Sequence, residues 1–75
     1  MIRYANKGGN SGIYAYEIQD DGIIVQFSSN AKYLYNYSSA GASKIEEMKR
    51  LATKGKGLNS YIMENVKKVF ASKLS

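Results

Sequence analysis

The stretch from Thr53 to Ser60, "TKGKGLNS", combines residue types that can hold a phosphate group. Gly55 and Gly57 leave their backbone N–H groups unshielded, since glycine has no side chain. Lys54 and Lys56 place ammonium groups beside them. Amides at the start of a helix, together with positive charge, form a common anion-binding arrangement. The same glycines also suit the end of one helix and the start of the next, so a purely structural role is the alternative.

Positive charge is concentrated in the second half of the chain. Residues 1–43 contain three basic and three acidic residues, whereas residues 44–75 contain eight basic and three acidic residues, which gives a net charge of +5. Such asymmetry permits an anionic partner such as RNA, but an ordinary solvated helix surface has the same composition. The candidate nucleic-acid or anion-binding residues are Lys49, Arg50, Lys54, Gly55, Lys56, Gly57, Asn59, Lys67 and Lys68.

The composition argues against catalysis. The chain has no histidine and no cysteine, which removes the commonest general base, the thiol nucleophile and the usual zinc ligands. Adjacent carboxylates at Asp20-Asp21 fit a turn between strands. Those at Glu46-Glu47 fit an exposed helix surface, on which Glu46 can pair with Arg50. We therefore expect a protein that is not an enzyme and that holds no cofactor and no metal.

The tyrosines of the stretch Tyr33–Tyr37, "YLYNY", can serve either as core or as a stacking surface. Alternation along a strand places them on one face, and the length of the preceding loop decides which face that is. A five-residue loop would pair Phe27 with Tyr33 and turn the tyrosines towards the apolar face. A four-residue loop would turn them away and place Asn36 on the core side, where its amide would need partners. The inward arrangement is therefore favoured.

Two further strands are expected before this stretch, at residues 12–19 and 23–28, because both are rich in β-branched and aromatic residues. Asp21-Gly22 predicts a two-residue turn between them, which pairs Asp20 with Ile23. This register gathers the apolar residues Tyr14, Tyr16, Ile18, Ile23, Val25 and Phe27 on one face.

The opposite face of this sheet is expected to be half apolar and open, with Ile13, Ala15, Ile24 and Gln26 on it, joined by Leu34 and Asn36 if the tyrosines point inward. An open apolar face in a small chain, or an unpaired edge strand, can contact a second copy or another protein. A protein-interaction or homodimerisation domain is therefore the alternative function.

Helical periodicity replaces alternation in the second half of the chain. One helix is predicted from residue 38 or 39 to Lys54 and a second from Leu58 to Phe70, with Gly55 ending the first. Residues 1–11 are predicted to be a flexible lead-in to a domain of residues 12–75, because they contain much Gly, Asn and Ser. The fold class is α+β, a three-stranded antiparallel meander packed against two C-terminal helices. The two apolar helix stripes are Ala42, Ile45, Met48, Leu51 and Ala52, and Leu58, Ile62, Val66, Val69 and Phe70.

Several short motifs, in this order, resemble the KTSC domain. Tyr35-Asn36-Tyr37 is similar to the Tyr-x-Tyr that is the family's hallmark, and Tyr14–Glu17 and Ile23–Phe27 resemble its first two strands. The stretch Lys54–Ile62 resembles its Lys-Gly segment. The family includes the C-terminal segment of some lysyl-tRNA synthetases and small free-standing bacterial proteins. Its role is unestablished, and the resemblance implies an association with RNA or tRNA.

The location of the protein is expected to be cytoplasmic. The N-terminal stretch "MIRYANKGGNSG" has no apolar run of the kind found in a signal peptide. No stretch approaches the roughly 18 apolar residues that cross a membrane.

Overall fold

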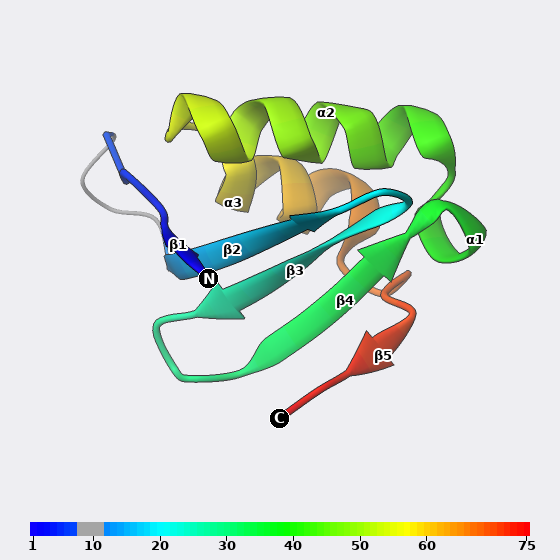
Figure 1. Cartoon of the computed structure of the whole chain (residues 1–75), viewed down its shortest axis with the longest axis horizontal. Coiled ribbons are helices and arrows are strands. Elements are labelled where there is room, and N and C mark those ends of the chain that lie inside the picture. The colour runs from blue at the N-terminus through cyan, green and yellow to red at the C-terminus, as the bar shows by residue number, and fades with distance from the viewer. Residues whose placement is uncertain (8–11) are drawn as a thin grey trace.

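The computed structural model describes residues 1–7 and 12–75. The fold is α+β: an antiparallel sheet has its helices packed over one face (Figure 1). The elements in chain order are β1 (Ile2–Arg3), β2 (Ile13–Gln19), β3 (Gly22–Phe27), β4 (Lys32–Asn36), α1 (Tyr37–Ala40), α2 (Ala42–Lys54), α3 (Leu58–Tyr61), the π-helical segment η1 (Ile62–Val66) and β5 (Ser72–Lys73).

Within residues 1–7 and 12–75 the sheet has five strands in the order β1-β2-β3-β4-β5, where three were predicted. The antiparallel meander of β2, β3 and β4 is confirmed as its centre. The two additional strands are two residues long and lie at the two edges. Strands this short carry no alternation pattern, which is why the sequence did not reveal them.

The turn between β2 and β3 has two residues, as predicted, but they are Asp20 and Asp21. Ile23 is therefore paired with Ile18, two residues from the predicted partner, and the faces of the strands are unchanged. Gly22 lies inside β3, where an added Cβ would be 2.5 Å from the carbonyl oxygen of Tyr35. The glycine thus permits the close approach of β4 and takes no part in the turn.

A bulge in β2 reverses the predicted positions of two neighbouring side chains. The register shifts between Ile13 and Ala15, so that Ile13 lies in the core, 4% exposed, and Tyr14 is 45% exposed. The Arg3 guanidinium lies over the Tyr14 ring, 4.6 Å from its centroid. Ile13 was expected on the open face and Tyr14 in the core, and both expectations were wrong because alternation is lost at a bulge.

The inward orientation of Tyr33 and Tyr35 is confirmed. Tyr33 pairs with Val25 and Tyr35 pairs with Ile23, a shift of two residues from the predicted register that preserves the face. Tyr37 does not continue the strand, because Asn36 caps α1. The Asn36 side chain accepts a hydrogen bond from the backbone N–H of Ser39 at 2.9 Å.

The two predicted helices are both shorter than expected. Gly41, at φ = 90°, separates α1 from α2, so the first helix is divided in two. In the second, Leu58, Ile62 and Val66 are buried as predicted, but η1 ends at Val66. The chain then turns back to the sheet, and β5 pairs with β4. The core consists of Tyr4, Ile13, Tyr16, Ile23, Val25, Tyr35, Ile45, Met48, Leu51, Ala52, Leu58, Ile62 and Val66.

The N-terminal residues belong to the folded unit. Residues 1–11 were predicted to be a flexible lead-in, yet β1 pairs with β2 and Tyr4 is only 5% exposed. The Tyr4 hydroxyl accepts a hydrogen bond from the backbone N–H of Leu58 at 3.2 Å. The burial of the Tyr4 ring and this hydrogen bond hold the segment in the fold, although its composition is typical of a flexible segment. Residues 8–11, which carried much of that prediction, lie outside the described residues.

Candidate nucleic-acid interface

The glycine-containing corner between α2 and α3 is packed beneath the N-terminal segment. Gly55 adopts the left-handed conformation, at φ = 80°, and its N–H donates to the Leu51 carbonyl at 2.9 Å, which confirms the predicted helix cap. Its own carbonyl accepts a hydrogen bond from the Lys7 N–H at 2.7 Å. A Cβ at this position would be 2.6 Å from the Cβ of Ala5.

Two backbone amides of this corner are engaged inside the protein. The N–H of Gly55 caps α2, and the N–H of Leu58 donates to the Tyr4 hydroxyl. Gly57 is also left-handed, at φ = 86°, and Asn59 is half-buried. Lys54 and Lys56 are exposed. The corner therefore offers an anion two ammonium groups, and its geometry is explained by the joining of two helices.

Two of the predicted cationic residues are held by carboxylates on the same helix. Lys49 lies 3.1 Å from Glu46 and also donates to the Asp20 carbonyl at 3.0 Å. Arg50 makes two hydrogen bonds to Glu47, at 2.6 and 2.9 Å, which hold the pKa of that carboxyl below its ordinary value. The hydrogen bond from Lys49 to Asp20 joins α2 to the turn between β2 and β3, and the two pairs with carboxylates reduce the charge available to a ligand.

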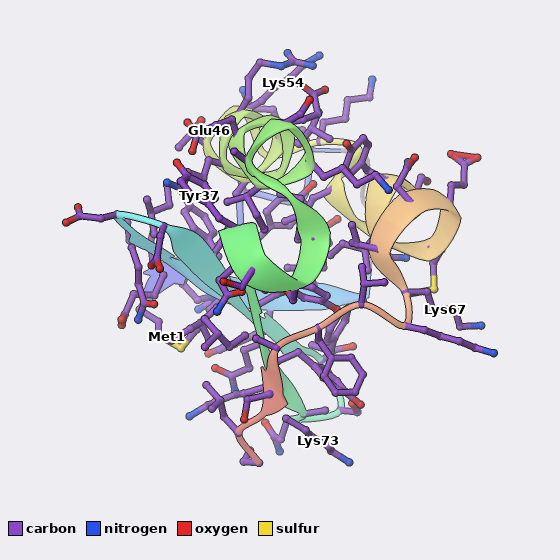
Figure 2. The ribbon with its side chains drawn as sticks, turned by 90° about the vertical axis from the view of Figure 1, so that its right-hand side faces the viewer. Met1, Tyr37, Glu46, Lys54, Lys67 and Lys73 are labelled. Carbon is purple, nitrogen blue, oxygen red and sulfur yellow. The ribbon has the colours of Figure 1, made fainter. Side chains whose placement is uncertain are left out.

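Tyr37 belongs to the same group of contacts. Its hydroxyl donates to Glu46 at 2.7 Å, and this hydrogen bond, followed by the one from Lys49, holds the pKa of Glu46 below its ordinary value. Figure 2 shows Tyr37 and Glu46 on the opposite side of the molecule from Lys67. Of the two tyrosines that resemble the KTSC hallmark, Tyr37 therefore fastens α1 to α2, whereas Tyr35 lies inside the fold.

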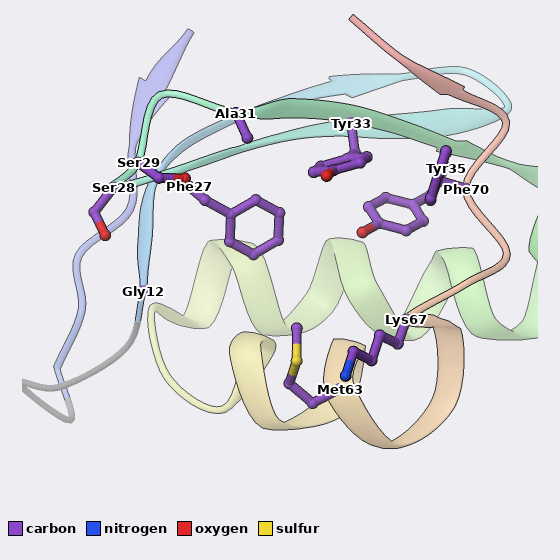
Figure 3. Close-up of a pocket in the computed structure, with 10 residues that line it drawn as sticks. All are labelled: Gly12, Phe27, Ser28, Ser29, Ala31, Tyr33, Tyr35, Met63, Lys67 and Phe70. Carbon is purple, nitrogen blue, oxygen red and sulfur yellow. The ribbon is translucent and has the colours of Figure 1, made fainter. Parts of the chain in front are cut away.

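An open pocket of about 420 Å³ lies between the sheet and η1 (Figure 3). The rings of Phe27, Tyr33 and Tyr35 project from the sheet towards the helical segment, while Met63 projects back towards the sheet and the Lys67 side chain runs along the helical segment. The volume falls within the range of small-ligand sites. Its lining residues are Gly12, Phe27, Ser28, Ser29, Ala31, Tyr33, Tyr35, Met63, Lys67 and Phe70.

Tyr33 is the centre of the aromatic cluster in this pocket. Its ring centroid lies 5.8 Å from that of Phe27 and 4.8 Å from that of Phe70, with interplanar angles of 77° and 59°. Tyr35 is 6.5 Å away, at 37°. Tilted and edge-on contacts of this kind are favourable between aromatic rings. Because the rings are not stacked on one another, the cluster can present ring faces to a planar ligand.

The Tyr35 hydroxyl is a polar group at the inner wall of the pocket. The side chain is only 2% exposed, and within residues 1–7 and 12–75 its hydroxyl makes no hydrogen bond. Burial, with a smaller contribution from nearby Tyr33, raises the pKa of Tyr35 to about 12. The hydroxyl therefore remains protonated near neutral pH and can donate a hydrogen bond into the pocket.

Positive charge accompanies the aromatic residues. Lys67 forms part of the wall, and the Lys73 ammonium lies 5.9 Å from the centroid of the Tyr33 ring. Lys68 is exposed next to Lys67. No carboxylate is among the described residues that line the pocket. Of the predicted cationic residues, Lys67 thus lines the aromatic cavity, and Lys68 is its exposed neighbour in the sequence.

Sequence reasoning missed this pocket. The inward face of Tyr33 was predicted, but Phe70 was placed on a helix stripe, and Lys73 was not named. The signal that could have indicated Phe70 was weak, since Val69-Phe70 suits a strand as well as a helix.

Comparison with protein-family models, curated proteins and solved structures found no match. The resemblance to the KTSC domain therefore stays a prediction that rests on the quoted motifs. Within the described parts of the chain, no helix is long and apolar enough to cross a membrane. The same residues contain no cluster of three or more carboxylates that could hold a metal ion.

Proposed function

We propose that the protein is a small non-enzymatic module that binds single-stranded RNA at the aromatic pocket and the lysines around it. The observation that carries this proposal is the combination of four aromatic rings with Lys67 in one open cavity. Proteins that bind single strands combine aromatic rings, on which bases stack, with cations that contact the phosphates. Lys67, Lys68 and Lys73 are the residues assigned to the phosphates.

The contacts on α2 support this choice of surface over the one first expected. Lys49 and Arg50 already pair with Glu46 and Glu47, so their charge is largely compensated. Lys54 and Lys56 keep a secondary role, because exposed ammonium groups raise the local concentration of an anionic strand without contacting it. The preference for RNA over DNA derives from the resemblance to the KTSC domain.

The alternative, a dimer through the outer face of the sheet, has less support. Ile13 lies in the core and Ala15 is buried within the monomer. Ile24 and Leu34 are paired across β3 and β4 and are half-buried. The apolar surface available to a partner on this face is therefore smaller than the sequence suggested.

The test is fluorescence anisotropy with a labelled single-stranded RNA of about twelve nucleotides. Three phosphate contacts predict that affinity falls about 20-fold when salt is raised from about 50 to about 200 mM. The double variant Lys67→Glu/Lys68→Glu should abolish most of the binding. Its matched control, Lys54→Glu/Lys56→Glu, makes the same change in net charge away from the pocket and should have a much smaller effect.

Two results would reject the proposal. One is an affinity for the strand that does not depend on salt. The other is an equal loss of binding in the two double variants, which would mean that net charge alone attracts the strand. Equal affinity for the corresponding DNA strand would remove the preference for RNA but keep the surface.

A further inference from the structure

The interior of the aromatic pocket offers a donor for which the protein supplies no acceptor. The Tyr35 hydroxyl points into the cavity and makes no hydrogen bond to a described residue; since no side-chain oxygen or nitrogen of the described residues is both buried and without a partner, this hydroxyl is open to solvent through the pocket. A ligand that fills the pocket would exclude solvent from this hydroxyl, which would then be unfavourable unless the ligand supplied an acceptor. A ligand that brought an acceptor atom to this point would therefore gain a hydrogen bond at a site prepared for it.

The remaining walls restrict what such a ligand can be. Phe27, Tyr33 and Phe70 present ring faces or edges, which suit a planar ring better than a flexible chain. An aliphatic chain would fill the volume but leave the Tyr35 hydroxyl without a partner. The cations Lys67 and Lys73 lie in the wall and beside Tyr33, so an anionic group joined to the ring would be stabilised there.

The lining also distinguishes between planar rings. Its charged side chain is Lys67, a donor, and no carboxylate or side-chain amide is among the described residues that line the pocket. A carbonyl oxygen on the ring can accept from the lysine and from the serine and tyrosine hydroxyls of the lining, whereas an exocyclic amino group can pair only with the hydroxyls. Uracil carries two carbonyl oxygens and no exocyclic amino group, while cytosine carries an amino group in place of one of them.

We infer that the pocket binds one unpaired uracil-type base with its attached phosphate, the base stacking against Tyr33 and accepting a hydrogen bond from Tyr35, and the phosphate lying beside Lys67. This inference rests on the proposed function, because it names the nucleotide that enters the RNA-binding site. The same chemistry is present in a free uridine nucleotide, so the experiment separates the two sources.

The experiment titrates the full ¹⁵N-labelled chain with uridine monophosphate, cytidine monophosphate and ribose 5-phosphate, and follows the backbone amide signals by NMR. Uridine monophosphate should shift the amides of Phe27, Tyr33, Met63 and Phe70. Cytidine monophosphate should bind about fivefold more weakly, which is the value of one lost hydrogen bond. Ribose 5-phosphate, which has no base, should leave these signals unchanged.

Two phenylalanine variants provide the matched comparison. Tyr35→Phe removes the hydroxyl in the pocket and keeps the ring, and it should weaken uridine monophosphate about tenfold. Tyr37→Phe removes a hydroxyl on the other side of the molecule and should leave the affinity unchanged. The inference is overturned if Tyr35→Phe has no effect, or if ribose 5-phosphate shifts the same signals as the nucleotide.

The outcomes distinguish this inference from the proposed function. If uridine monophosphate binds in the pocket but the RNA strand does not bind, the inference holds for a free nucleotide and the proposed function fails. If the strand binds with the expected salt dependence, but Tyr35→Phe changes neither its affinity nor that of the nucleotide, the inference fails and the proposed function stands.

Discussion

The contact between Gly55 and Ala5 can be tested by the substitution Gly55→Ala. The new Cβ has two separate consequences. At φ = 80° any L-residue is in a left-handed conformation, which costs about 1–2 kcal/mol relative to glycine. In addition, the Cβ would lie 2.6 Å from the Cβ of Ala5, and relieving that overlap by shifting the N-terminal segment costs about 1–3 kcal/mol more.

Gly57→Ala provides the matched control for the first consequence. Its φ of 86° imposes the same strain, but the nearest atom to the new Cβ is a Leu51 methyl carbon at 3.8 Å, an ordinary contact. Gly57→Ala should therefore cost about 1–2 kcal/mol and Gly55→Ala about 2–5 kcal/mol. In a domain of this size each kcal/mol lowers the melting temperature by about 4–8 °C.

A double variant isolates the overlap itself. Ala5→Gly removes the atom that the new Cβ would meet, so Ala5→Gly/Gly55→Ala should be destabilised only by the backbone strain at residue 55. Urea unfolding, followed by circular dichroism, gives the four free energies of the cycle, and a coupling of about 1–3 kcal/mol is expected. A coupling near zero, with Gly55→Ala no worse than Gly57→Ala, would refute the packing of residues 5–7 on the corner.

Two further predictions concern buried tyrosine hydroxyls. Tyr4→Phe leaves the Leu58 N–H without its acceptor and should lower the free energy of unfolding, measured by urea titration, by about 1–2 kcal/mol. The exposed control Tyr14→Phe should change it by less than about 0.5 kcal/mol. Equal effects of the two variants would contradict the hydrogen bond. Burial raises the pKa of Tyr35 to about 12, so the folded state favours the protonated phenol. The stability that this preference adds to the folded state is fully present below the ordinary pKa of 10.0, and it is lost as the pH rises from there through about 12. Tyr35→Phe should flatten this alkaline loss of stability, and an unchanged pH profile would count against the burial of the hydroxyl.

The faces of the central strands could be predicted from the sequence because a shift of register by two residues preserves them. Both hairpins were displaced by two positions from the expected pairing, yet Tyr16, Val25 and Tyr35 lie on the predicted side. The predicted faces are wrong only at the bulge around Tyr14, where one extra residue moves each neighbouring side chain to the opposite face of the sheet. Nothing in the local pattern marks that bulge, because it is set by the pairing of Ile13 with Phe27.

The ends of the chain could not be predicted, because their structure depends on partners distant in sequence. Ile2 and Arg3 form a strand because β2 offers an edge, and Ser72 and Lys73 do so because β4 offers the other. A helix through Phe70 was consistent with the period of the apolar residues. Tertiary pairing overrides such a preference when the competing strand is already present in the sheet.

The candidate site depends on this same departure from local preference. Had the second helix continued to Phe70, that ring would not lie 4.8 Å from Tyr33. Lys73 would not lie over the Tyr33 ring if β5 did not pair with β4. Phe70 and Lys73 therefore join Tyr33 only because the chain leaves the helix after Val66 and returns to the sheet. A motif search along the sequence finds the lysines near Gly55, because they are adjacent in the chain. It cannot find the pocket, because its residues become neighbours only in the folded chain: Phe27, Tyr33, Lys67 and Phe70.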